Sequence, residues 1–167
     1  MQRMLLVLLL AGCASTAPAP ENHLVQVPDS LRPASSESLK RVISAKGVQI
    51  YQCRDQKWVF VAPEAQLFDS SGNLVGRHFA GPTWEASGDG SKVVGTTKSR
   101  ADAPAAGAIP WLLLGTKSVG GSGYFSDVTS IQRVATAGGV APAGDCSGTG
   151  AQARVPYTAD YYFFHAK

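Results

Sequence analysis

Residues 76–85 hold the densest group of side chains suited to binding or proton transfer. They read GRHFAGPTWE, which places a cation, an imidazole, two aromatic rings and a carboxylate around a Gly-Pro turn. In a pocket wall, Trp84 would stack on a ligand while His78 and Glu85 hydrogen-bond to it. In the alternative, Phe79 and Trp84 are core residues and the two polar side chains are solvated. Because side chains alternate along a strand, His78 and Glu85 share a face only if both aromatic rings lie on the other face.

A second aromatic group consists of Trp111, within the sequence AIPW, and Tyr124, beyond a glycine-rich turn. Exposed tryptophan and tyrosine suit stacking on sugars, whereas the aromatic residues of a β-domain more commonly belong to its core. Both residues are therefore candidate ligand-binding residues, together with His78, Trp84 and Glu85.

The chain contains no GxSxG elbow, no HExxH motif and no CxxC pair. Residues 148–153 match the pattern GxGxxG/A, but they follow Cys146 and precede Val155-Pro156 instead of joining a strand to a helix. We therefore expect neither a cofactor nor a bound metal. The net charge of +3 is too small to indicate a nucleic-acid partner.

The catalytic residues, if any, are not evident from the sequence, and we favour a protein that is not an enzyme. The enzymatic alternative is a hydrolase or lyase that acts on an envelope polymer. It would use His78 as the base, with Glu85, Asp89 or Asp160 as its carboxylate partner.

The first thirteen residues, MQRMLLVLLLAGC, are typical of a secretory signal. Arg3 precedes an apolar run over residues 4–10, which is too short to span a bilayer as a mature helix. The sequence LAGC resembles the lipobox of bacterial lipoproteins, which implies cleavage after residue 12 and acylation of Cys13. Because Ala14 and not Asp follows, the resemblance implies an outer-membrane lipoprotein facing the periplasm in a Gram-negative host. The alternative is an ordinary secretory signal that happens to contain a cysteine.

Two cysteines remain once Cys13 is assigned to lipid. An even pair in an exported protein indicates a disulfide between Cys53 and Cys146. The alternative is two buried free thiols.

The rest of the chain divides into a tether and one domain. Residues 13–36 are rich in Ala, Pro and Ser, which predicts a flexible tether. Residues 37–167 form a single β-rich domain, in which ESLKRVI at 37–43 predicts one or two helical turns. From Gly47 on, short strands separated by turn residues predict an all-β antiparallel sandwich or barrel. One such turn, SSGN at 70–73, predicts a hairpin.

The final strand, YTADYYFF, carries aromatic residues on both faces. Alternation places Tyr161 and Phe163 on one face and Tyr162 and Phe164 on the other. We therefore predict that this strand is packed on both sides.

Several phrases along the domain are similar to those of one family of secreted or lipid-anchored bacterial and fungal proteins, which is catalogued as a domain of unknown function. They include GVQIYQC, GRHFAGPTWEASGDGSKVVG, GAIPWLLL, GSGYFSDVTSIQRVATAGGVAP and RVPYTADYYFF. The resemblance covers residues 47–164. It implies a cysteine pair like Cys53 with Cys146, but no established activity and no catalytic residues.

These observations favour a non-enzymatic envelope lipoprotein whose tethered β-domain binds a ligand or a partner. Its partners would be the membrane, through lipidated Cys13, and a glycan or a protein of the envelope. The second alternative to this function, after the hydrolase, is a passive structural protein of the envelope. That alternative predicts no pocket lined by Trp84, Trp111 or Tyr124.

Overall fold

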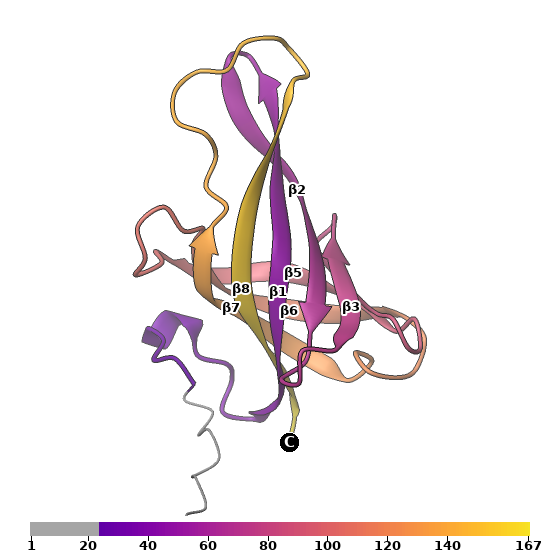
Figure 1. Ribbon diagram of the computed structural model, residues 1–167. Coiled ribbons are helices and arrows are strands. Elements are labelled where there is room, and N and C mark those ends of the chain that lie inside the picture. The colour runs from indigo at the N-terminus through magenta and orange to yellow at the C-terminus, as the bar shows by residue number, and fades with distance from the viewer. Residues whose placement is uncertain (1–23) are drawn as a thin grey trace, which may run out of the picture.

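The computed structural model describes residues 24–167, in which eight strands follow one another around an antiparallel sheet (Figure 1). The strands are β1 (Glu37–Arg54), β2 (Lys57–Phe68), β3 (Leu74–Phe79), β4 (Thr83–Ala86), β5 (Lys92–Ala101), β6 (Trp111–Gly120), β7 (Val128–Gly138) and β8 (Gln152–Ala166). Each strand pairs with its successor, and β8 returns to pair with β1. Of the two predicted architectures, the sheet is therefore the closed barrel.

The helical turns predicted for residues 37–43 are wrong. This segment is the first part of β1, where Val42 lies opposite Tyr162 and Ile43 opposite Tyr161. A short isolated helix is marginal in water, whereas pairing with β8 satisfies the backbone and buries Ile43 in the core. The hairpin predicted around residues 70–73 is confirmed, with Gly72 in the left-handed region at a φ of 80°.

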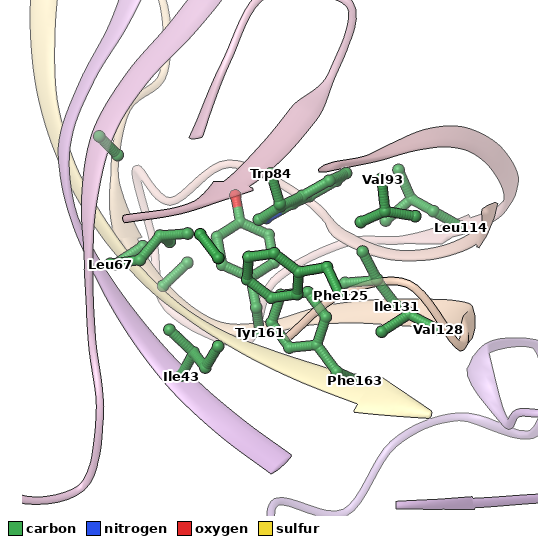
Figure 2. Packing of buried hydrophobic residues seen from close by; sticks show 14 of the residues in the cluster. Ile43, Leu67, Trp84, Val93, Leu114, Phe125, Val128, Ile131, Tyr161 and Phe163 are labelled. Atoms are coloured by element: carbon green, nitrogen blue, oxygen red, sulfur yellow. The ribbon is translucent and has the colours of Figure 1, made fainter. Parts of the chain in front are cut away.

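The main core lies inside the barrel. Figure 2 shows Trp84, Tyr161, Phe125 and Phe163 packed together in its middle. The ring of Trp84 lies across β5, where only a glycine leaves room, because a Cβ atom on Gly95 would lie 2.9 Å from Trp84 Cζ3. The buried interior is thus built around aromatic rings.

One end of the barrel is closed by the β6–β7 loop. Phe125 of this loop is fully buried, and its ring stacks on Phe163 with the centroids 5.0 Å apart. Its backbone N–H donates to Ser91 Oγ at 3.0 Å, which fixes the loop to the β4–β5 turn. Phe125 therefore occupies this end of the barrel interior.

A second apolar cluster lies outside the barrel, under the segment that precedes β1. This segment carries the 3-10 helix η1 (Asp29–Leu31), and Leu31 is fully buried against Trp111 and Tyr162. Gln132 Nε2 donates to the carbonyl oxygen of Leu31 at 2.6 Å. Residues 24–36, predicted as part of a free tether, therefore pack on the domain.

The predicted signal over residues 1–12, the anchor at Cys13 and the tether up to residue 23 lie outside the described residues. Within residues 24–167, no helix has the length and apolar character needed to cross a membrane.

The β1–β2 hairpin projects beyond the rest of the barrel, and the β7–β8 loop reaches its tip (Figure 1). The predicted disulfide between Cys53 and Cys146 is confirmed and joins the two. The N–H of Cys146 also donates to the carbonyl oxygen of Gln56 at 2.9 Å. Asp55 and Gln56 at the tip both have positive φ, as in a type I′ turn, where Asp suits the first position and Gly is preferred at the second. The loop thus holds a turn whose second residue, Gln56, does not favour this conformation.

Candidate functional site

A cavity of about 640 Å³ lies in the barrel at the end opposite the loop of Phe125. It reaches solvent beside the projecting hairpin, where Phe60 and Val61 are 50% and 44% exposed. Its walls come from all strands and from the β3–β4 and β5–β6 connections. The lining residues include Gln49, Tyr51, Phe60, Val61, Pro63, His78, Pro82, Trp84, Thr97, Arg100, Ile109, Pro110, Leu112, Leu114, Arg133 and Tyr161.

His78 and Trp84 lie opposite each other on β3 and β4, with both side chains inside the barrel. Their rings are stacked with centroids 4.2 Å apart, and Tyr161 meets the imidazole edge-on at 5.2 Å. As alternation predicts, His78 and Phe79 lie on opposite faces of β3, and Trp84 and Glu85 lie on opposite faces of β4. His78 and Trp84 share the inner face. The expectation of a solvated His78 and a core Phe79 is wrong, because His78 is buried and Phe79 is half-buried outside.

The imidazole of His78 has a fixed protonation state. Its Nδ1 lies 2.8 Å from the carbonyl oxygen of Thr83, so Nδ1 carries the proton and donates it in a hydrogen bond. Burial lowers the pKa of His78 to about 3, a net result that the hydrogen bond to Thr83 opposes and the nearby charge of Arg133 assists. The ring is therefore neutral at pH 7. Because its folded-state pKa is below the unfolded value, His78 supports the folded state above pH 6.5 and loses that contribution as the pH falls towards 3.

Polar groups of the wall come from β1, β5, β7 and the β5–β6 connection. Arg133 donates from Nε and Nη2 to the carbonyl oxygen of Pro110, at 3.1 and 2.8 Å. The hydroxyl of Tyr51 donates to the carbonyl oxygen of Gly139 at 2.6 Å. Arg100 is exposed where the cavity opens. These contacts hold the β5–β6 and β7–β8 connections against the wall.

The remaining candidates from the sequence lie elsewhere. Glu85 is on the outer face, where Arg77 Nη2 donates to its carboxylate at 2.8 Å. Trp111 belongs to the outer cluster beneath Leu31. Tyr124 lies in the loop that closes the other end of the barrel, with the guanidinium of Arg41 3.6 Å above its ring. Of the five candidate ligand-binding residues, the cavity therefore brings together only His78 and Trp84.

None of the three carboxylates proposed as a partner for His78 approaches it. Glu85 is paired outside, Asp89 accepts hydrogen bonds from the N–H groups of Ser91 and Tyr124, and Asp160 accepts one from Ser44 Oγ. The acid–base pair of the envelope hydrolase is thus not assembled. Within residues 24–167, no group of three or more His, Cys, Asp and Glu side chains is arranged to hold a metal ion.

Arg133 is the lining residue that the sequence argument missed. The signal was present in the β7 sequence, VTSIQRVATAG, where alternation puts Arg133 on the same face as the core residue Ile131. A charged residue at an inward position of a strand is uncommon and indicates either a partner or a site.

A family model described as "Protein of unknown function (DUF3455)" matches residues 33–165. The match begins shortly before β1 and ends within β8, so it spans the whole barrel and every residue that lines the cavity. No curated protein and no solved structure matches the chain.

Proposed function

Since the chain belongs to the family described as proteins of unknown function (DUF3455), we propose a function from the geometry of its own barrel. The domain is a binding protein that holds a small molecule in the cavity beside His78 and Trp84. The observation that carries this proposal is the cavity itself, which is large, mostly apolar, open at one end and closed at the other. Small-molecule sites in β-barrels have this form.

Two observations favour binding over the alternatives. A passive structural protein has no need of a cavity lined by Trp84, and a hydrolase of the predicted kind needs a carboxylate beside His78. Among the described residues that line the cavity, none is an Asp or a Glu. His78, held neutral with its Nδ1–H already donated, is suited to shaping the wall.

We also propose that the domain acts at the cell envelope. The disulfide is typical of proteins from oxidising compartments. Together with the lipobox-like sequence, it supports export and anchoring through acylated Cys13, with the outer membrane as the site in a Gram-negative host. As a partner for the outer surface, we propose a glycan or protein of the envelope.

A thermal-shift screen of the full chain carrying Cys13→Ser tests the binding function. The panel holds small amphiphiles, aromatic acids and alcohols, peptidoglycan fragments and glycans. A ligand at a hundred times its Kd is expected to raise the Tm by about 5–10 °C, because it binds only the folded state.

A matched pair of variants shows whether the shift comes from the cavity. Thr97 lines it, whereas the adjacent Thr96 points to the outer face. Thr97→Trp should abolish the shift and Thr96→Trp should preserve it. An equal shift in both variants, or no shift across the panel, would contradict the proposal.

The anchoring proposal predicts that wild-type protein sediments with the membranes and that Cys13→Ser releases it. The physical reason is that several acyl chains on one residue bind a bilayer stably, whereas the protein moiety alone does not. Cell fractionation followed by mass spectrometry of the N-terminal peptide measures both the location and the acylation. A wild-type protein that is recovered soluble and unacylated would refute the anchor.

A further inference from the structure

The charged groups that face the cavity are of one sign. Arg133 lies inside the barrel, opposite Leu112 on β6 and Tyr161 on β8. Arg100 lies on β5 where the cavity opens, also opposite Leu112. Among the described residues that line the cavity, no carboxylate offsets these two cations, and neither arginine forms an ion pair within residues 24–167.

The positive charge of Arg133 acts on the interior. The guanidinium is held by a neutral carbonyl oxygen, that of Pro110, so its charge is not cancelled. Burial raises the pKa of Tyr51 and of Tyr161, and the charge of Arg133 opposes that rise. Arg133 is half-buried, and a charge that is partly removed from water interacts more strongly than one at a surface.

The rest of the wall is apolar or neutral. Leu112, Leu114, Ile109 and Pro63 form an aliphatic surface, and Trp84 forms the aromatic floor. An occupant complementary to this wall has an apolar body and a compact negative group placed near Arg133.

We infer that the cavity binds a molecule with an apolar body and a single oxyanion such as a carboxylate, with Arg133 and Arg100 binding the negative charge. This inference rests on the proposed binding function and adds the chemical class of the ligand. Guanidinium groups suit the role because they donate two parallel hydrogen bonds to a carboxylate and remain charged at any physiological pH.

Three probes that share one apolar body test the inference: naphthalene-2-carboxylate, 2-naphthylmethanol and 2-naphthylmethylammonium. Isothermal titration calorimetry with the full chain carrying Cys13→Ser gives a Kd for each. The carboxylate is expected to bind about 10- to 100-fold more tightly than the alcohol, because hydrogen bonds to charged groups are stronger than neutral ones. The ammonium is expected to bind most weakly.

Variants of the two arginines show which of them accounts for the preference for the carboxylate probe. Arg133→Gln should remove that preference. Because Arg133 also holds Pro110, Arg100→Gln provides an independent test at an exposed position, and there the preference should fall about threefold. Arg77→Gln is the matched control, since Arg77 is next to His78 on β3 but lies on the outer face, paired with Glu85.

The outcomes separate this inference from the binding function. A carboxylate preference that is lost with Arg133→Gln and kept with Arg77→Gln supports both. Equal binding of the three probes, blocked by Thr97→Trp, overturns the inference and leaves the binding function in place. If none of the three probes binds at millimolar concentration, the inference is also overturned. The binding function is then decided by the panel of the thermal-shift screen.

Discussion

Loss of the disulfide between Cys53 and Cys146 is expected to lower the free energy of unfolding by about 4 kcal/mol. The two cysteines are 93 residues apart, so the bond removes a large amount of chain entropy from the unfolded state. The double variant Cys53→Ala/Cys146→Ala, unfolded in urea and followed by circular dichroism, measures the loss. The folded wild-type domain should also show no reaction of these two residues with a thiol reagent.

The control for this variant is Ser147→Ala, an exposed neighbour of Cys146, which should leave the unfolding midpoint unchanged. The double variant loses stability only if the disulfide is formed in the folded protein. A double variant as stable as wild type, or full thiol labelling of the native domain, would disprove it.

Trp84→Ala is expected to destabilise the domain by about 3–5 kcal/mol, a large part of the stability of a single domain. Trp84 is 1% exposed, stacks on His78 and contacts Tyr161 and Phe163 edge-on. Removing the indole leaves a cavity in the middle of the core, which the surrounding strands cannot fill. Chemical denaturation of the purified variant measures the change.

Trp84→Phe separates the loss of the ring from the loss of the indole N–H. Trp84 Nε1 is buried with no hydrogen-bond partner among the described residues, so its removal costs no hydrogen bond. We expect a loss of about 1.5 kcal/mol for this variant. Trp58→Ala, on the projecting hairpin where the side chain is half-buried, should cost about 1 kcal/mol. Full stability of Trp84→Ala would show that the ring is not part of the core.

The local parts of the fold were predictable from the sequence. The turn at residues 70–73 follows from its residue types, and the two-faced packing of β8 follows from alternation. Tyr161 and Phe163 lie inside the barrel, while Tyr162 and Phe164 lie in the outer cluster. Alternation does not show which elements pack against each face of β8. The choice between sandwich and barrel depends on the pairing of β1 with β8, which is a long-range contact.

The site was predictable only in part, for the same reason. Alternation correctly separates His78 from Phe79, but it does not say which face becomes the interior. The interior face is the one on which His78 meets Tyr161 of β8, a strand far away in the sequence. Arg133 faces the same interior from β7, next to Tyr161 in the sheet. The cavity is therefore a property of strands far apart in the chain, and local sequence patterns identify only single members of it.

The pairing of β8 with both β1 and β7 constrains when the protein can fold. Synthesis produces β1 first and β8 late, so both long edges of the unfinished sheet stay unpaired until residues 152–166 have been made. Open edges invite pairing with other chains, and folds dominated by distant contacts form slowly, on the order of milliseconds to seconds. A chain of this design acquires its native structure only after translation has passed β8. Such a delay suits a polypeptide that crosses a membrane unfolded, and it leaves the unfinished chain prone to aggregation.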